Sequence, residues 1–382
     1  MKIAVNTRLL LKNKLEGIGW FTYENLSRIT RQHQEHQFYF LFDRKYSLDF
    51  VFSENVRPLI IPPQARHPIL YYLWFEKAVP RMLKKIQPDI FLSPDGYLSL
   101  ANKTIPSLTV FHDLNFEHYP EDIPFLERKN YRYFFPRYAR HADRIATVSD
   151  YSKNDIAELY KVDKDKIDVV YNGANEQFVP VEDIVKQQTR QKHTKGKPYF
   201  VFIGSLHPRK NLINLFKAYD HFKKSTDNPV QLLIVGEKMW WTSKIEATYN
   251  AMQFKEQVHF SGRLPVKELH HALASAMALT YVSYFEGFGI PIVEAFRCDV
   301  PVITSNLTSM PEVAGDAALL TDPFDPVSIS KAMAEIYHDR KLREELIVKG
   351  RKRKEIFTWQ KSADRLWQSI LKTIENHQNK KS

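Results

Sequence analysis

Short apolar runs separated by amphipathic stretches recur along the whole chain and predict strands that alternate with helices. Apolar runs of this length, bounded by glycine or polar residues, are typical of strands buried on both faces of a parallel sheet. The expected strands fall in two groups, residues 2–10, 37–42, 57–61, 89–93, 108–111, 144–148 and 167–171, then residues 199–203, 231–235, 258–261, 278–282, 300–304 and 317–321. Alternation of strand and helix predicts the α/β class with two doubly wound sheets.

Between the two groups of strands, residues 181–197 are polar and charged and show no buried pattern. This stretch is predicted to be an interdomain linker. The predicted organisation is therefore an N-terminal domain (residues 1–180), the linker, a C-terminal domain (residues 198–357), and a terminal amphipathic helix with a polar tail (residues 358–382).

Length, cysteine count and net charge limit the number of domains, the compartment and the type of partner. The 382 residues suffice for two domains, and no run approaches the ~20 apolar residues of a membrane-spanning helix. Cys298 is the only cysteine, so no internal disulfide can form, and we expect a cytoplasmic protein. The net charge of +11 indicates an anionic partner, a nucleotide or an anionic membrane surface, unless the surplus lysines are only solvated. Nucleic-acid and zinc-ligand motifs are absent, so we expect no nucleic-acid partner.

A glycine loop joins the expected strand at 278–282 to a helix that begins at Ile290. The free N–H groups at such a helix start attract phosphate. Glu286 precedes the helix and Glu294 lies about one turn inside it. Carboxylates accept hydrogen bonds from sugar hydroxyls. Phosphate and hydroxyl recognition in one loop fits a nucleotide-sugar, whereas the alternative is an ordinary sheet turn with two surface glutamates.

Arg209 and Lys210 follow the expected strand at 199–203 and Gly204. Cations in a strand-to-helix loop can clamp a diphosphate, although a surface basic pair is a common alternative. Two such cations can neutralise a leaving diphosphate without a divalent metal. No metal-binding Asp-x-Asp motif is recognised, since Asp163 and Asp165 lie in a charged surface stretch. We therefore expect no metal cofactor.

The segment Glu286-Gly287-Phe288-Gly289 with Glu294, followed by residues 301–305 (PVITS) and 311–318 (PEVAGDAA), resembles the motif of retaining family 4 glycosyltransferases. The resemblance implies the GT-B fold, in which two Rossmann-like domains face each other across a cleft and a C-terminal helix crosses back to the first domain. It implies a first domain that binds the acceptor and a second that binds the nucleotide-sugar. It further implies transfer with retention of anomeric configuration.

The resemblance also assigns roles to residues. It implies that Glu286 holds sugar hydroxyls, that Glu294 holds the ribose, and that Arg209 and Lys210 bind the diphosphate. His112 follows the strand at 108–111, and the resemblance implies a contact with the donor sugar. The residues expected in catalysis are His112, Arg209, Lys210 and Glu286. The residues expected to bind the donor are Gly17, Gly19, Gly204, Arg209, Lys210, Gly236, Arg263, Leu264, Glu286, Gly287, Phe288, Gly289, Ile290 and Glu294.

Two expected helices, residues 67–86 and 123–142, interleave aromatic with basic side chains. Pro80 is expected to kink or break the first of them. An apolar side beside a basic side can lie on an anionic bilayer or bind an acceptor. The alternative is that both helices pack on their own sheet and expose a solvated basic edge.

The segments Pro208-Arg209-Lys210-Asn211 and Gly17-Ile18-Gly19 are similar to those of bacterial mannosyltransferases of polysaccharide assembly. This similarity implies GDP-mannose as donor, with a UDP-hexose next, and a glycan or lipid-linked glycan as acceptor at the inner face of the cell membrane. Two alternatives remain open. One is a non-catalytic nucleotide-sugar-binding partner protein, and the other is a GT-B epimerase or phosphorylase, against which the paired glutamates argue.

Overall fold

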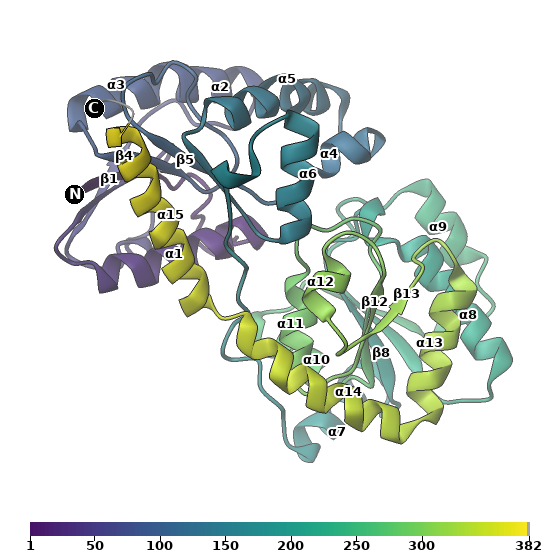
Figure 1. The fold of residues 1–382 in the computed structure, drawn as a ribbon. Coiled ribbons are helices and arrows are strands. Elements are labelled where there is room, and N and C mark those ends of the chain that lie inside the picture. Colours follow the sequence, from purple (N-terminus) through teal and green to yellow (C-terminus); the bar gives the residue numbers. More distant parts are fainter. Residues whose placement is uncertain (380–382) are drawn as a thin grey trace. The chain divides into compact units, whose positions relative to one another are not determined.

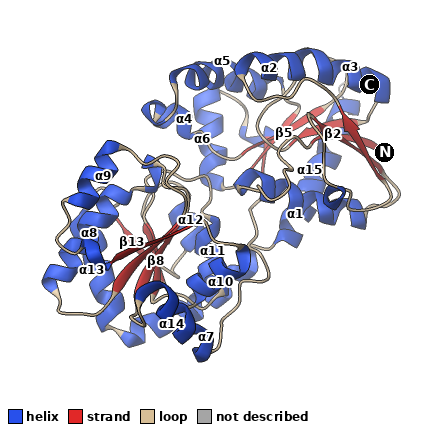
Figure 2. Cartoon of the chain, turned by 180° about the vertical axis from the view of Figure 1, so that it is seen from behind, coloured by secondary structure: helices blue, strands red, loops and turns tan. Residues whose placement is uncertain are grey.

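The computed structural model describes residues 1–379 and divides them into two compact units (Figure 1). Unit 1 comprises residues 1–172 with the C-terminal segment from Trp359, and unit 2 comprises Gly173–Thr358. Each unit has its own parallel sheet with helices on both faces, so the predicted pair of doubly wound α/β domains is confirmed (Figure 2). The part of the predicted polar tail that follows Asn379 lies outside the described residues.

The sheet of unit 1 has seven parallel strands in the order β3-β2-β1-β4-β5-β6-β7. Their bounds are β1 (Lys2–Asn6), β2 (Gln37–Phe42), β3 (Val56–Ile60), β4 (Ile90–Ser93), β5 (Ser107–Phe111), β6 (Arg144–Thr147) and β7 (Ile167–Val169). The strand order reverses between β1 and β4. In doubly wound sheets ligands bind outside the carboxyl ends of the strands at such a switch point.

The helices of unit 1 are α1 (Gly17–Gln32), α2 (Pro68–Leu73), α3 (Val79–Ile86), α4 (Asn115–His118), α5 (Phe125–His141), α6 (Asp150–Tyr160) and α15 (Trp359–Asn379). A π-helical segment, Trp74–Ala78, joins α2 to α3. It ends two residues before Pro80, which has no N–H and whose ring would clash with the carbonyl of Glu76 in a regular helix. The expected distortion at Pro80 therefore takes the form of a widened turn.

The terminal helix α15 packs on α1 and on β4, β5 and β6. The chain thus returns to unit 1 after completing unit 2, and the prediction of a C-terminal helix that crosses back to the first domain is confirmed.

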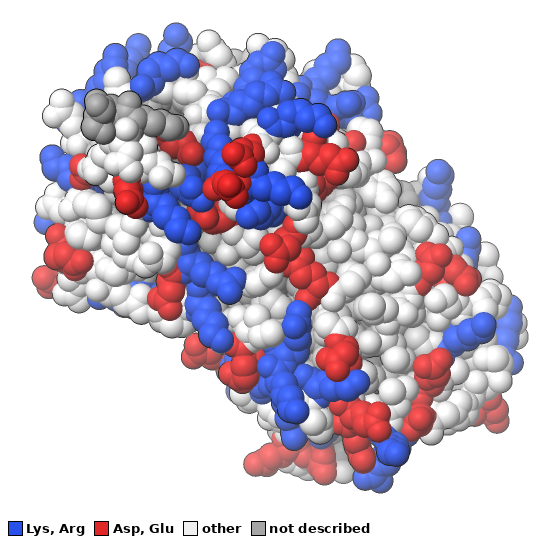
Figure 3. Space-filling model, in the orientation of Figure 1, with Lys and Arg blue, Asp and Glu red and all other residues white. Residues whose placement is uncertain are grey.

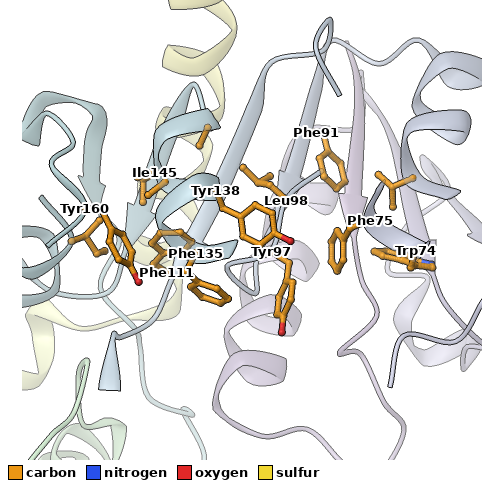
Figure 4. Close-up of a cluster of buried hydrophobic side chains, with 14 of the residues drawn as sticks. Trp74, Phe75, Phe91, Tyr97, Leu98, Phe111, Phe135, Tyr138, Ile145 and Tyr160 are labelled. Atoms are coloured by element: carbon orange, nitrogen blue, oxygen red, sulfur yellow. The ribbon is translucent and has the colours of Figure 1, made fainter. Parts of the chain in front are cut away.

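The core of unit 1 is rich in aromatic side chains, and the π-helical segment Trp74–Ala78 and α5 supply several of them (Figure 4). Trp74 is fully buried, and its indole N–H donates to the carbonyl oxygen of Ile61 at 2.8 Å. Phe111 and Phe135 stack at 5.3 Å between ring centroids. Burial of each such side chain contributes roughly 1.5–3 kcal/mol, which fixes these helices on the sheet.

The sheet of unit 2 has six parallel strands in the order β10-β9-β8-β11-β12-β13. Their bounds are β8 (Tyr199–Ile203), β9 (Gln231–Val235), β10 (Val258–Gly262), β11 (Ala278–Tyr281), β12 (Val302–Ser305) and β13 (Leu319–Thr321). The order reverses between β8 and β11. The loops that follow these two strands therefore begin at the switch point of the sheet.

The helices of unit 2 are α7 (Asp183–Thr194), α8 (Leu212–Ser225), α9 (Ser243–Asn250), α10 (Val266–Ala274), α11 (Ile290–Arg297), α12 (Met310–Ala314), α13 (Pro326–His338) and α14 (Arg340–Arg353). A buried apolar cluster formed mainly by β8, β9, α8 and α13 holds the sheet and its helices together. The helices α9, α10 and α12 were not predicted from the sequence.

The predicted linker at residues 181–197 is wrong. Most of this stretch forms α7, which packs against α10, β9 and β10 and belongs to unit 2. Polar contacts tie it down: Arg190 Nε donates to the carbonyl oxygen of Ser275 at 3.1 Å, and the Thr194 hydroxyl donates to the carbonyl oxygen of Lys197 at 2.6 Å. A helix held mainly by such contacts has no apolar stripe that periodicity could detect.

Candidate functional site

The side chain of Glu286 lies at the centre of a buried polar network in unit 2. One carboxylate oxygen, Oε2, accepts from Arg209 Nη1 at 2.6 Å. The other, Oε1, accepts from Lys210 Nζ at 2.5 Å and from the Tyr281 hydroxyl at 2.9 Å. Lys210 is 7% exposed and Glu286 is 5% exposed. The structure therefore brings together three of the predicted catalytic residues and adds Tyr281 to them.

The residues of this network determine one another's protonation states. Burial raises the pKa of Glu286, but the neighbouring Arg209 and Lys210 outweigh burial and hold it at about 2. Burial and the neighbouring Glu286 carboxylate raise the pKa of Tyr281 well above its ordinary value. At neutral pH Glu286 is ionised and Tyr281 is a neutral hydroxyl. Two cations and one carboxylate leave one net positive charge, which suits an anionic ligand.

The loop after β8 carries both cations in a 3₁₀ turn, Pro208–Lys210. Asn211 ends this turn in the left-handed region, with φ 62°. Its side-chain amide donates to the carbonyl oxygen of Val282 at 3.0 Å and to that of Pro323 at 2.6 Å. The turn is thereby tied to the loop after β11, which carries Glu286. Asparagine adopts this conformation more readily than most residues, which explains its place at the end of the turn.

Two residues of the loop after β12 hold the backbone around Glu286. The Thr308 hydroxyl accepts from the Glu286 N–H at 3.3 Å. The Ser309 hydroxyl donates to the carbonyl oxygens of Glu286 and Phe288 at 2.9 and 3.2 Å. Thr308 has φ 56°, an uncommon conformation for a β-branched residue that often marks a functional loop.

Sequence reasoning missed Thr308 and Ser309 as part of the site. The available signal was their position, since residues 306–309 follow β12 at the same edge of the sheet as Glu286.

The glycine loop ends at Gly289, which has φ 101° and is the N-cap of α11. A Cβ at Gly289 would lie 3.1 Å from the Ile292 side chain, so any other residue would be both strained and crowded. Ile290 is the first residue of α11, and Pro291 occupies its first turn. Phe288 is buried and packs edge-to-face against Phe357, and this contact holds the loop in place. Gly287 lies between Glu286 and this anchor. The predicted glycine loop and helix start are confirmed as structure, and their role in phosphate binding stays a prediction.

Glu294 lies on α11, and its environment differs from that of Glu286. Burial alone raises the pKa of the Glu294 carboxyl to about 7. Among residues 1–379, no hydrogen bond or ion pair to this carboxyl is found. Glu294 is half-buried, and a carboxyl that is partly removed from water without a counter-charge costs stability; such groups are concentrated at binding sites. The predicted ribose contact is not tested by this observation.

Glycines end three neighbouring strands at the same edge of the sheet, Gly204 after β8, Gly236 after β9 and Gly262 at the end of β10. Gly236 has φ 156°, and a Cβ there would lie 1.9 Å from the Gly204 carbonyl oxygen. Only glycine allows these two backbones to approach so closely. Exposed Arg263 and half-buried Leu264 follow β10 directly.

The remaining predicted residues belong to unit 1. His112 follows β5, and its Nε2 lies 2.8 Å from the carbonyl oxygen of Pro94. Burial lowers the pKa of His112, so at neutral pH the ring is neutral. A carbonyl only accepts, so Nε2 carries the proton and Nδ1 is left as an acceptor.

Gly17 is the first residue of α1 and is exposed. Gly19 is buried, and a Cβ at this position would lie 3.1 Å from the Leu9 carbonyl oxygen. The donor contacts of His112, Gly17 and Gly19 stay predictions.

Family models match almost the whole chain. The model described as Glycosyltransferase Family 4 matches residues 16–178, and the model described as Glycosyl transferases group 1 matches residues 184–353. The first match falls mostly in unit 1, and the second falls in unit 2 and contains the Glu286 network.

Named relatives are similar to the chain over different lengths. The O-antigen chain mannosyltransferase B of Escherichia coli is 29% identical over 77% of this chain and 78% of its own length. The O-antigen chain mannosyltransferase RfbU of Salmonella typhimurium is 29% identical over 62% of this chain and 61% of its own. Among solved structures, Anabaena HepE in complex with UDP and glucose superposes with a TM-score of 0.75 at 15% identity, over 97% of this chain and 100% of HepE.

The pKa of Glu294 predicts a pH dependence of stability. The ordinary pKa of a glutamate is 4.5, whereas that of folded Glu294 is about 7. Between these values the unfolded chain has released the proton and the folded chain has kept it. The free energy of unfolding therefore falls as pH rises through this window, by up to about 3 kcal/mol. Glu294→Gln should remove this fall and be more stable than the wild type at pH 8.

Denaturant unfolding at pH 5 and pH 8 measures the difference. Glu246→Gln, at an exposed glutamate of α9, is the control and should keep the pH dependence of the wild type. An unchanged pH dependence in Glu294→Gln would show that Glu294 titrates normally.

Proposed function

Because the chain belongs to the group 1 and family 4 glycosyltransferases of the GT-B fold, we propose that it transfers a hexose from a nucleotide-sugar to a glycan or lipid-linked glycan in cell-surface polysaccharide synthesis. The observation that carries the proposal is the network in which Glu286 binds Arg209 and Lys210 at the switch point of unit 2. Mannose is the hexose we favour, because two relatives are named O-antigen mannosyltransferases.

In the proposed reaction the bond between the anomeric carbon and the diphosphate breaks, and negative charge develops on the departing oxygen. Arg209 and Lys210 would stabilise this charge, since both cations are already fixed by Glu286. Charged groups oriented before the reaction stabilise a transition state without reorganisation. The positive end of the α11 dipole, which begins at Ile290, would add to the same effect.

Glu286 would have a second role toward the donor sugar. Its carboxylate is ionised and rigidly held, so it offers remaining lone pairs to sugar hydroxyls without having to reorient. Glu294 would accept the ribose hydroxyls, which would supply the partner that its carboxyl lacks among the described residues. We favour GDP-mannose as donor and place a UDP-hexose next, since HepE is described in complex with UDP and glucose.

We also propose that transfer retains the anomeric configuration. In this mechanism the acceptor hydroxyl attacks from the face that the diphosphate leaves, and its proton passes to the departing phosphate oxygen. Both carboxylate oxygens of Glu286 already accept hydrogen bonds from Arg209, Lys210 or Tyr281, which lowers their nucleophilicity and argues against a covalent intermediate on Glu286. A nucleotide-sugar epimerase or a non-catalytic binding protein remains the alternative, and transfer to an acceptor would exclude both.

Replacement of Glu286 tests this site. Glu286→Gln should lower transfer by roughly 100-fold or more, because the cations lose the charge that orients them. Radiolabelled sugar transfer from GDP-mannose and UDP-glucose to membrane-extracted lipid-linked glycans measures the rate.

The same substitution leaves two buried cations less well paired, so the melting temperature should also fall. The rate is therefore compared below the melting transition of the variant, with circular dichroism to verify folding. Glu246→Gln is the control and should retain the wild-type rate. A folded Glu286→Gln enzyme with normal transfer would remove Glu286 from the site.

We further propose that unit 1 contacts an anionic membrane through α2 and α5, which pack against each other. Ile69 on α2 and Leu126 on α5 are 66% and 65% exposed, and Phe125 is 55% exposed. Basic side chains lie among them, with Lys129 Nζ 4.4 Å from the Phe125 ring centroid. Figure 3 shows Lys and Arg gathered along the edge of unit 1 that α2, α3 and α5 form. Exposed apolar side chains surrounded by cations suit the interface of an anionic bilayer.

None of the helices within residues 1–379 is both long and apolar enough to cross a membrane. Contact would therefore be peripheral, and vesicle flotation tests it. The protein should float with phosphatidylglycerol vesicles more than with phosphatidylcholine vesicles. Replacement of Phe125 and Leu126 by serine should reduce binding about tenfold or more, since each insertion contributes about 1–2 kcal/mol. Val348→Ser, at an exposed apolar residue of α14 in unit 2, is the control. Equal flotation of the double variant and the control would contradict the proposal.

A further inference from the structure

A second buried ion pair lies at the carboxyl edge of the unit 1 sheet. Arg8, just beyond β1, donates through Nε to Asp95 Oδ2 at 2.6 Å. Asp95 lies just beyond β4, so the pair spans the switch point of this sheet. The side chains of Arg8 and Asp95 are 7% and 3% exposed. None of the residues predicted from the sequence belongs to this pair.

Asp95 is fully occupied within the protein. Its Oδ1 accepts from the Ser93 hydroxyl at 3.1 Å and from the Tyr97 N–H at 3.2 Å. Ser93 in turn accepts from the side-chain amide of Asn6 at 3.0 Å. These bonds fix the carboxylate, and through it they fix the plane of the Arg8 guanidinium.

Within the part of the chain that the structure describes, the guanidinium of Arg8 makes a hydrogen bond only through its Nε. Its Nε binds Asp95, whereas Nη1 and Nη2 have no hydrogen-bond partner within residues 1–379. Neither nitrogen is among the buried polar atoms that lack a partner, so both keep contact with solvent. A side chain that is more than nine-tenths buried thus presents up to four N–H donors to the outside of the protein.

Aromatic rings surround the rest of the Arg8 side chain. The guanidinium carbon lies 4.9 Å from the ring centroid of Tyr97, 5.0 Å from that of Tyr71 and 5.8 Å from that of Phe75. The rings of Tyr97 and Phe75 also stack on each other, with 5.2 Å between their centroids (Figure 4). The rings hold the cation in place and keep water from all but its outer edge.

A comparison within unit 1 shows what a purely structural pair looks like. Arg144 donates to Asp168 through both Nε and Nη2, at 2.8 and 2.7 Å. Its Nη2 also donates to the carbonyl oxygen of Asp165 at 2.9 Å. The Arg144 guanidinium uses two of its nitrogens inside the protein, whereas Nη1 and Nη2 of Arg8 have no partner within residues 1–379 and keep contact with solvent.

The net charge and the hydrogen-bond donors of the Arg8–Asp95 pair indicate which class of ligand it can bind. Asp95 cancels the charge of Arg8, so the site is neutral overall and gives little attraction to a free anion. It supplies donors only, arranged in one plane. Adjacent hydroxyls of a neutral sugar offer two acceptor oxygens at a spacing that such a fork can bridge. The loop that holds Asp95 also receives the hydrogen bond of His112, through the carbonyl oxygen of Pro94.

From this geometry we propose that Arg8, oriented by Asp95, binds two adjacent hydroxyls of a hexose unit of the acceptor glycan. The identification of that hexose as part of the acceptor rests on the proposed function. Binding of a neutral sugar at Arg8 does not.

Arg8→Lys tests the inference, because a lysine keeps the ion pair with Asp95 and has no second edge for a ligand. Saturation-transfer NMR with methyl α-mannoside, methyl α-glucoside and methyl α-galactoside measures binding to the full chain. We expect at least one glycoside to bind the wild type and to lose about tenfold or more in affinity in Arg8→Lys. Arg144→Lys is the matched control and should bind as the wild type does. Equal binding by the Arg8 and Arg144 variants would overturn the proposal, as would the failure of all three glycosides to bind the wild type.

A chemical measurement covers the case in which Arg8→Lys does not fold. Phenylglyoxal modifies accessible guanidinium groups, and peptide mass spectrometry locates the product. The bound methyl glycoside should protect Arg8 and leave the exposed Arg340 of α14 unprotected. Protection of Arg8 by inorganic phosphate instead of the glycosides would show an anion site and overturn the proposal.

Transfer kinetics separate this inference from the proposed function. In Arg8→Lys the KM for the acceptor should rise about tenfold or more, while the KM for the donor and the hydrolysis of the donor by water stay unchanged. An unchanged acceptor KM would refute the role of Arg8 in acceptor binding. Absence of both transfer and hydrolysis in the wild type would instead refute the proposed function. The NMR measurement with the methyl glycosides would then decide by itself whether Arg8 binds a neutral sugar.

Discussion

The buried carboxylate of Glu286 is the constraint on which the site of unit 2 depends. A carboxylate removed from water must be paired, and here two cations from another loop pair with it. The bonds of Asn211 to Val282 and Pro323 and those of Thr308 and Ser309 to the Glu286 segment bring further loops to the same point. Cations, carboxylate and helix start are thus assembled before any ligand arrives.

The two sheets use the same device at their switch points. In each unit an arginine and an acid from neighbouring strand ends form a buried pair, Arg209 with Glu286 and Arg8 with Asp95. The pairs differ in net charge. Lys210 gives the first an additional positive charge that suits a diphosphate, whereas the second is neutral and suits a sugar. Glu294 has no counter-charge among the described residues, so its partial burial lowers the stability of the folded chain at neutral pH.

The sequence predicted the strands well because strands buried on both faces appear as apolar runs, as in Tyr199–Ile203 and Gln231–Val235. It predicted Arg209, Lys210 and Glu286 as site residues because a motif marks them. It failed for α7, whose contacts are largely polar and leave no apolar stripe. It also missed Thr308, Ser309, Arg8 and Asp95, since their roles come from contacts between loops that are distant in sequence. Periodicity describes one element at a time and carries no information on such pairs.

The most direct test of the central claim is the binding of guanosine, GMP and GDP, and of their uridine counterparts, by calorimetry with EDTA present. If Arg209 and Lys210, held by Glu286, form a diphosphate site, the diphosphate of the preferred base should bind at least about tenfold more tightly than its nucleoside. The difference should shrink as salt is added, because the interaction is between charges. Equal affinity of nucleoside and diphosphate, or tight binding that persists without Arg209, would contradict the account.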